Sequence, residues 1–194
     1  MKLAVFVILA QFSDWEGAYL ASQLNQSDQW QVRYAANQRQ ATSIRGMTLV
    51  PDYQLDHLPS KIDLLVLIGG KAWQLNNLEL ATLIQQRLQT NQPVAAICGA
   101  VDFLAAQGLL NNYQHTGNSL ASWANFTKYR NSADFKEQQV VCDRNLVTAN
   151  GTASLDFTET VLNLIHFSNQ NQQLVDLYRL GFYRYVAKYG NPFA

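Results

Sequence analysis

Cys98 stands where a buried strand is predicted to run into a turn made of small residues. The apolar run 94–97 predicts a short core strand, and residues 101–107 predict the beginning of a helix. Gly99 and Ala100, between the two, are small enough for a sharp turn. This order is typical of a nucleophile elbow, in which a strained turn lifts one side chain beside a helix N-terminus. Because helix N-terminal amides lower the pKa of a cysteine, we expect Cys98 to be a reactive thiol.

Two other groups follow strands that are predicted to lie in the same sheet. Glu16 comes soon after the first strand, and Gly69-Gly70 ends the third. In a parallel sheet the functional crevice lies at the carboxyl ends of the strands, so these groups converge with Cys98. Glu16 is then placed to control the protonation of the thiol, and glycine amides can approach an oxyanion closely. An ordinary glycine turn, and a glutamate that only complements the helix dipole, remain open as alternatives.

The elements that must position these groups alternate between strands and helices. Apolar runs predict strands at 3–9, 30–35, 62–68 and 94–97, and a hairpin from 139–141 and 145–149. Helical spacing is found at 14–24, 78–90, 101–107 (with Gly108 as its C-cap), 154–167 and, interrupted at Gly181, 170–189. Residues 43–51 read as a small hairpin or an edge segment, and residues 52–58 as containing a short helical turn. This alternation predicts an α/β fold with a parallel, doubly wound sheet.

Composition argues against several classes of partner. Basic and acidic residues number 14 each, so nothing indicates binding to nucleic acid or to an anionic membrane. No apolar stretch reaches the ~20 residues of a membrane span, and the apolar start lacks a signal-peptide cleavage pattern. Cys98 and Cys142 could form one disulfide, but a cytoplasmic protein with reduced thiols is the simpler interpretation. No spacing of His, Cys, Asp or Glu predicts a metal site, and we expect no cofactor.

Four motifs together resemble those of a known family. In chain order they are DWEGAYL with Glu16, LLVLIGG with Gly69 and Gly70, AAICGA with Cys98, and TANGTASLDFT. They resemble the ThiJ/PfpI superfamily of class I glutamine amidotransferase-like proteins, and within it the intracellular protease/amidase branch, over about residues 1–167. The resemblance implies a flavodoxin-like three-layer sandwich with a mainly parallel sheet and a nucleophile elbow. It also implies one domain over residues 1–194, with a C-terminal helical extension at about 170–190.

The resemblance also implies roles for individual residues. Cys98 would be the nucleophile and Glu16 its carboxyl partner, while the amides of Gly70 and Gly99 would line an oxyanion site next to Gly69. The loop 150–154 would lie near the crevice. We therefore expect Asn150, Thr152 and Trp15 to border the pocket, with Trp73 and Trp123 either beside it or in the core. The resemblance further implies a small-molecule substrate and a homodimer.

The histidines depart from the patterns of the family. Amidotransferases of this fold pair their cysteine with a later His-x-Glu, which is lacking here, and the protease-like branch has histidine where this chain has Gly99. His57 reads as a loop residue and His166 as a residue at a helix end. His115 lies in a region from which some members place a histidine near the cysteine. The register leaves open whether His115 or Thr116 takes that place, and a structural role for His115 is equally open.

Three functions are consistent with this pattern. The first is a cysteine-dependent enzyme, hydrolase- or lyase-like, that acts on a small carbonyl, amide or related electrophile. Because the usual histidine base is missing, we expect neither true glutaminase nor peptidase activity. The second is a redox or stress-responsive protein whose Cys98 is oxidised, and the third is a non-catalytic binding module. Cys142, in the hairpin, is expected to be structural.

Overall fold

The computed structural model describes residues 1–74 and 76–193. Seven strands of this part of the chain form one sheet in the order β5-β2-β1-β6-β7-β9-β8. They are β1 (Lys2–Val7), β2 (Trp30–Ala36), β5 (Tyr53–Gln54), β6 (Leu64–Leu67), β7 (Val94–Ile97), β8 (Val140–Asp143) and β9 (Leu146–Ala149). Every pairing is parallel except that of β8, which runs antiparallel to β9 at one edge. The predicted doubly wound sheet is therefore confirmed.

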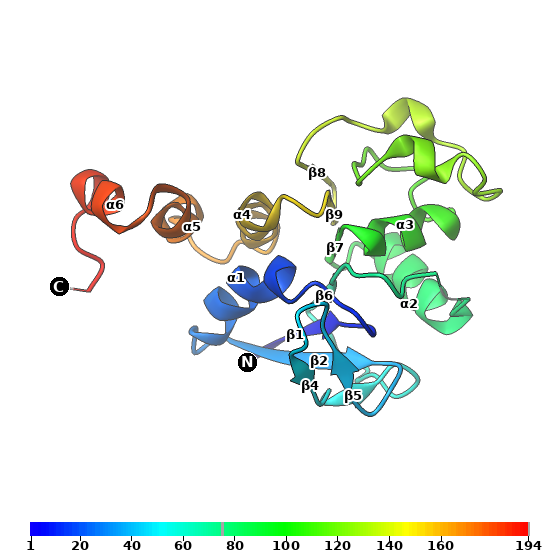
Figure 1. The fold of residues 1–194 in the computed structure, drawn as a ribbon, viewed down its shortest axis with the longest axis horizontal. Helices are drawn as coiled ribbons and strands as arrows, with labels where there is room; N and C mark the ends of the chain where they lie inside the picture. The colour runs from blue at the N-terminus through cyan, green and yellow to red at the C-terminus, as the bar shows by residue number, and fades with distance from the viewer. Residues whose placement is uncertain (75, 194) are drawn as a thin grey trace.

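The described residues form six α-helices, four of which cover the two faces of this sheet (Figure 1). They are α1 (Asp14–Asn25), α2 (Leu78–Gln89), α3 (Gly99–Ala106), α4 (Ser154–Leu164), α5 (Asn171–Leu180) and α6 (Phe182–Tyr189). Figure 1 shows α1 and α4 on one side of the sheet and α2 and α3 on the other. The result is the flavodoxin-like three-layer sandwich that the resemblance implied, with β6 and β7 in its centre.

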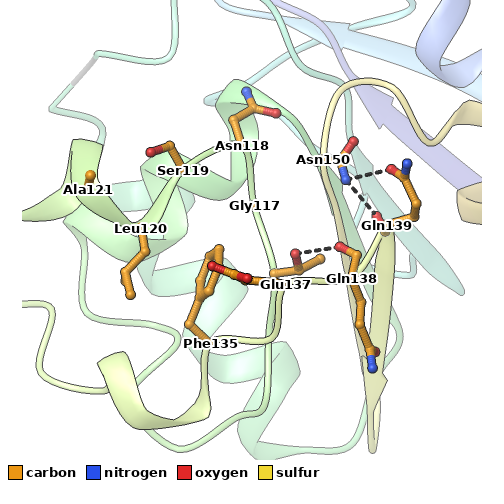
Figure 2. A pocket seen from close by; sticks show the side chains of 11 residues that line it. Gly117, Asn118, Ser119, Leu120, Ala121, Phe135, Glu137, Gln138, Gln139 and Asn150 are labelled. Atoms are coloured by element: carbon orange, nitrogen blue, oxygen red, sulfur yellow. Dashed lines mark hydrogen bonds between the residues drawn. The ribbon is translucent and has the colours of Figure 1, made fainter.

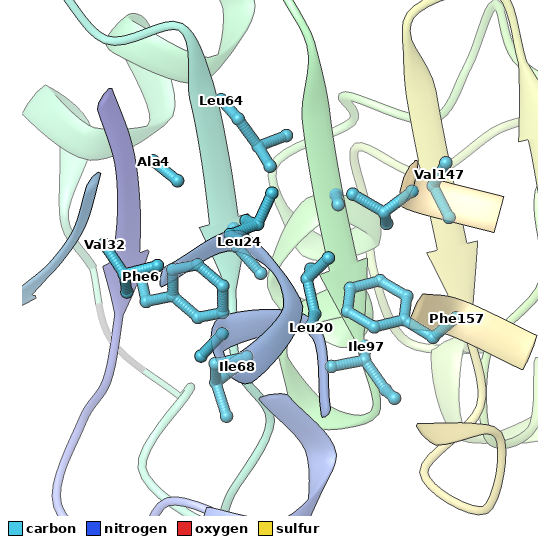
Figure 3. Packing of buried hydrophobic residues seen from close by; sticks show 14 of the residues in the cluster. Ala4, Phe6, Leu20, Leu24, Val32, Leu64, Ile68, Ile97, Val147 and Phe157 are labelled. Atoms are coloured by element: carbon cyan, nitrogen blue, oxygen red, sulfur yellow. The ribbon is translucent and has the colours of Figure 1, made fainter. Parts of the chain in front are cut away.

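The central strands are buried on both faces, and their side chains alternate between two apolar clusters. Phe6 of β1 packs in one cluster with Leu20 of α1 and Phe157 of α4 (Figure 3). Its neighbour Val7 belongs to the cluster on the other face, which contains Phe103 of α3. Because successive side chains of a strand point to opposite faces, an unbroken apolar run supplies side chains to the apolar clusters on both faces of the sheet. This arrangement holds the carboxyl ends of β1, β6 and β7 next to one another.

The segment 52–58 contains a strand that the sequence does not predict. This strand is β5, which pairs in parallel with the end of β2. The amide of Asp52 donates to the carbonyl of Tyr34, and the amide of Leu55 to that of Ala36. The predicted turn follows β5, where the amide of His57 donates to the carbonyl of Gln54 at 3.0 Å. The hairpin expected at 43–51 is present as β3 (Ala41–Thr42) and β4 (Thr48–Leu49).

The last two helices follow α4 at the end of the chain (Figure 1). Gly181, with φ of 75°, separates α5 from α6. Arg179 of α5 forms ion pairs with Asp156 at 2.7 Å and Glu159 at 2.9 Å, both on α4, and with Asp176 at 3.0 Å on its own helix. A network of charges thus attaches α5 to α4. In the described residues, no helix combines the length and the apolar character needed to cross a membrane.

Candidate active site

The backbone of Cys98 has the strained conformation of a nucleophile elbow. Its φ of 59° and ψ of −130° lie in a region that glycine adopts readily and other residues adopt only with strain. The turn is fixed on both sides, because the Cys98 amide donates to the carbonyl of Ala149 at 2.9 Å and the Val101 amide donates to the carbonyl of Cys98. The predicted elbow is therefore present, with the half-buried thiol at the N-terminus of α3.

Three glycines allow the backbone to close around the thiol. A Cβ atom on Gly99 would lie 2.5 Å from the carbonyl oxygen of Gly70. A Cβ atom on Gly151 would lie 2.8 Å from the sulfur of Cys98 and 3.2 Å from Oε1 of Glu16. Gly70 itself has φ of 147°, which side chains rarely adopt. The crevice is thus built from close approaches that only glycine permits.

Glu16 lies in this crevice, in the first turn of α1, with 1 % of its surface exposed. Its carboxyl group contacts the thiol of Cys98, the side chain of Ser13 and the amide of Gly69. These contacts are loose, because Oε2 has no partner of standard hydrogen-bond geometry among the described residues. Burial raises the pKa of Glu16 to about 7, while the three contacts lower it only in part. Glu16 can therefore give or take a proton near neutral pH.

The amide of Gly99 at the start of α3 does lower the pKa of Cys98, as expected, but the net shift of this pKa is upward. Burial raises the pKa of the thiol above its ordinary value, and the charge of Glu16 raises it further. Hydrogen bonds from Asn118 and from the amide of Gly99 oppose this rise without cancelling it. The resting form is therefore the thiol, so attack on a substrate requires a group that removes its proton.

Asn118 touches the thiol, and sequence analysis missed it. Its Nδ2 atom donates to the sulfur of Cys98 at 3.3 Å, and its Oδ1 atom accepts from the amide of Gly151 at 2.9 Å. The second bond fixes the orientation of the side-chain amide, so that the NH₂ group faces the sulfur. A donor in this position stabilises negative charge on the sulfur. The place of this residue, three after His115, is the only signal that the sequence offered.

Gly70 and Gly99 are the glycines whose amides were expected to line an oxyanion site. The Gly99 amide faces the sulfur of Cys98 and lowers its pKa. The amide of Gly70 donates no hydrogen bond within the described residues, although its neighbour Lys71 donates to the carbonyl of Gln11 and Gly69 accepts from Ser13. The Gly99 amide thus contacts the thiol, and the Gly70 amide is without an acceptor among the described residues.

All three histidines belong to the described residues, and none is a hydrogen-bond partner of Cys98. His115 is fully buried, with Nδ1 on the carbonyl of Tyr113 and Nε2 on the hydroxyl of Tyr129, both at 2.7 Å. Burial lowers its pKa, so the ring is kept neutral. His57 pairs with its neighbour Asp56 on the surface, and His166 is exposed at the end of α4. The geometry favours the structural role for His115.

The expected pocket residues separate into two groups. Asn150 and Thr152 form a network with Gln139, in which Asn150 Nδ2 donates to Gln139 Oε1 at 2.6 Å and Thr152 Oγ1 donates to both partners. Trp15 instead stacks on Arg45, with the guanidinium carbon 4.5 Å from the ring centroid. Trp123 is buried and donates to Asp102. Asn150 and Thr152 adjoin the crevice through Gly151, and the buried Trp73 adjoins it on the other side, where a Cβ atom on Gly99 would lie 3.6 Å from its ring.

A groove of about 740 Å³ opens beside this network (Figure 2). It is lined by residues 116–121, by Phe135 and residues 137–139, and by Asn150. Asn118, which bonds the sulfur, and Asn150, which precedes Gly151, connect the groove to Cys98. Its size is in the range of small-molecule sites.

Metal ligands do not gather anywhere in residues 1–74 and 76–193. No group of three or more His, Cys, Asp or Glu side chains there could hold a metal ion. Cys98 and Cys142 are both free thiols.

Comparison with known proteins identifies relatives along the whole chain. The model of the DJ-1/PfpI family matches residues 1–164, which end before α5. Uncharacterized protease YdeA of Bacillus subtilis is 46 % identical over 195 residues, covering 100 % of this chain and 99 % of the relative. The crystal structure of a thiJ/pfpI family protein from Bacillus anthracis is 30 % identical, with a TM-score of 0.87 over 96 % of this chain and 94 % of that one. The DJ-1 superfamily protein Atu0886 from Agrobacterium tumefaciens, also 30 % identical, covers 93 % of this chain and 98 % of its own with a TM-score of 0.83. The chain belongs to the DJ-1/PfpI family.

Proposed function

We propose that this protein is a cysteine-dependent enzyme that acts on a small carbonyl compound, an amide or a related electrophile. The observation that carries the proposal is the pairing of Cys98, in its strained elbow, with the buried Glu16 of raised pKa, about 7. Strained backbone and a carboxyl group poised near neutral pH are costly, and both features concentrate at functional sites. Here they occur on two elements that meet at one crevice.

The proposed reaction begins with transfer of the thiol proton of Cys98 to the carboxylate of Glu16. The sulfur attacks the carbonyl carbon, and the carbonyl electron pair moves to oxygen, which the Gly70 and Gly99 amides stabilise. With an amide substrate, Glu16 returns its proton to the leaving amine as the carbon–nitrogen bond breaks. Water then hydrolyses the thioester and restores the thiol. A donor and acceptor of pKa near the working pH suits both transfers.

The lack of a free histidine base beside Cys98 in the described residues argues against glutamine or a peptide as the substrate. In both of those reactions the related enzymes use a histidine as base, and here the ring nitrogens of His115 are engaged by Tyr113 and Tyr129. The name of the Bacillus subtilis relative says protease, which is compatible with amide cleavage as a reaction class. We therefore propose a hydrolase- or lyase-like activity and expect no release of ammonia from glutamine.

The test is a turnover screen with methylglyoxal, simple aliphatic amides and glutamine, combined with intact-mass detection of adducts on the protein. Cys98→Ala and Glu16→Gln are compared with the control Cys142→Ser, which removes the thiol outside the crevice. We expect turnover or an adduct with a carbonyl or amide, lost in the first two variants and kept in the control. Equal activity of Cys98→Ala, or glutamine hydrolysis as the sole activity, would overturn the proposal.

A redox role is the second candidate, because the half-exposed sulfur of Cys98 lies beside the donor Asn118, which can bond an oxidised sulfur. Mild peroxide followed by peptide mass spectrometry distinguishes the two: oxidation of Cys98 without turnover on any substrate favours this role.

We further propose that the protein is cytoplasmic, with reduced thiols, and that it forms a homodimer. Sedimentation of the purified protein tests the homodimer.

A further inference from the structure

The groove beside Cys98 carries one charge, and that charge has no partner. Glu137 is the single ionisable side chain among the residues that line it. Within the described residues its carboxylate forms neither an ion pair nor a hydrogen bond. Two neighbouring amides are engaged, since Asn150 binds Gln139 and Asn118 binds Gly151 and Cys98. Ser119 and Gln138 are exposed, as Glu137 is, and their side chains likewise have no hydrogen bond within the described residues, but they are neutral. Glu137 is thus the one charged group that the groove offers to a ligand.

The surroundings of Glu137 define what it would bind. Leu120 and Phe135 line the same groove, and Figure 2 places them with Glu137 toward one end and Asn118 and Asn150 toward the other. An apolar surface with a carboxylate at its end suits a short alkyl chain that ends in an ammonium group. The opposite end reaches the residues that touch the sulfur.

We propose that Glu137 determines substrate specificity by binding an ammonium group joined, through a short aliphatic chain, to the carbonyl or amide that Cys98 attacks. The inference rests on the proposed function and deepens it, because it names the class of substrate. Glu137 touches no reacting atom in this scheme. It selects and orients the substrate, whereas the chemistry at Cys98 is unchanged when the charge is removed.

Charged thiol reagents test the inference independently of any substrate. The rate of Cys98 modification is measured with a cationic reagent, trimethylammonioethyl methanethiosulfonate, and with its anionic analogue, sulfonatoethyl methanethiosulfonate. The protein carries Cys142→Ser, so that one thiol reports. We expect the ratio of the cationic to the anionic rate to fall about tenfold in Glu137→Gln at low salt, and this effect to shrink near 0.5 M salt.

The controls separate the failure of this inference from that of the proposed function. Glu79→Gln removes the same charge from the exposed start of α2, outside the groove, and must leave the ratio unchanged. The neutral reagent iodoacetamide must modify Cys98 equally in all variants. An unchanged ratio in Glu137→Gln would overturn the inference, although Cys98 still reacted normally. Failure of every reagent at Cys98 would instead count against the proposed function.

Binding by a cationic amide is the second readout. 5-Aminopentanamide should protect Cys98 from iodoacetamide at a concentration about tenfold lower than pentanamide, which lacks the charge. The difference should disappear in Glu137→Gln and persist in Glu79→Gln. Equal protection by the two compounds in the protein with Glu137 intact would overturn the assignment of an ammonium subsite.

Discussion

The side-chain amide of Asn118 donates a hydrogen bond to the sulfur of Cys98 over 3.3 Å, across twenty positions of sequence. Since Gly151 holds the other end of that amide, Asn118 presents a donor and no acceptor to the sulfur. Thiolate is therefore favoured by an uncharged neighbour in this crevice, while Glu16 on the other side disfavours it. The reactivity of Cys98 therefore depends on the balance between the opposite effects of Asn118 and Glu16 on its pKa.

Asn118→Asp should make Cys98 less reactive. The substitution replaces the donor by a carboxylate, which raises the pKa of the thiol further, and one pKa unit corresponds to a factor of ten in thiolate. We expect iodoacetamide alkylation of Cys98 near pH 8 to slow about tenfold, measured by peptide mass with Cys142 as the internal reference. Asn112→Asp, a charge added outside the groove, serves as the control. Unaltered alkylation of Cys98 would remove Asn118 from the site.

Glu16→Gln should shift the pH profile of Cys98 alkylation toward lower pH. The carboxylate raises the pKa of Cys98 by its charge and by its contact, and glutamine has no charge. Alkylation followed from about pH 6 to 10 should therefore become several-fold faster near pH 8. Turnover of any substrate should fall in the same variant because the proton acceptor is gone. A profile identical to that of the parent protein would reduce Glu16 to a charge at the start of α1.

The same substitution should change how stability depends on pH. The pKa of Glu16 is raised from 4.5 to about 7 in the folded protein, so the folded state holds its proton more tightly than the unfolded state. The corresponding stability is fully present below pH 4.5 and is lost as pH rises through about 7, by about 3 kcal/mol in all. The free energy of unfolding of Glu16→Gln, measured with urea, should therefore rise relative to that of the parent protein as the pH increases from 4 to 8. A constant difference would contradict the raised pKa.

His115→Gln should affect stability and leave the thiol alone. Its ring nitrogens bind Tyr113 and Tyr129 in the interior, so we expect a loss of about 1–3 kcal/mol in urea unfolding. Cys98 alkylation should change less than about twofold, since the ring does not bond the sulfur. The pKa of His115 is lowered by burial, so the stability it contributes decreases as pH falls through its unfolded pKa of 6.5. Strongly slowed alkylation of Cys98 would contradict the structural role of His115 and indicate that it belongs to the active site.

The residues of the crevice that follow strands could be predicted from the sequence, whereas those in the long loop between α3 and β8 could not. Cys98 and Glu16 follow apolar runs whose carboxyl ends must meet in a parallel sheet, so their convergence follows from topology. Asn118 lies between α3 and β8, where the described structure has only short 3-10 turns. Its register is set from outside, for example by the bond from the Thr116 amide to Thr148 of β9. No local pattern contains that information.

The strand within 52–58 was missed for the same reason. A two-residue strand such as β5 has no periodicity of its own and exists because the end of β2 offers hydrogen bonds. The pKa of Cys98 was also beyond sequence reasoning. The helix terminus was visible in the sequence, whereas the depth of burial that outweighs it depends on the packed structure.

The glycines around Cys98 have a consequence for how such a site can change over time. The spacing between Gly99 and Gly70, and between Gly151 and the sulfur, is set by main chain, so it persists whichever side chains line the groove. Residues such as Glu137 can then be exchanged without moving the nucleophile. In such a scaffold the residues that react and the residues that select the substrate are separate. Single substitutions in the groove can then change substrate selectivity, whereas almost no substitution of the crevice glycines is tolerated.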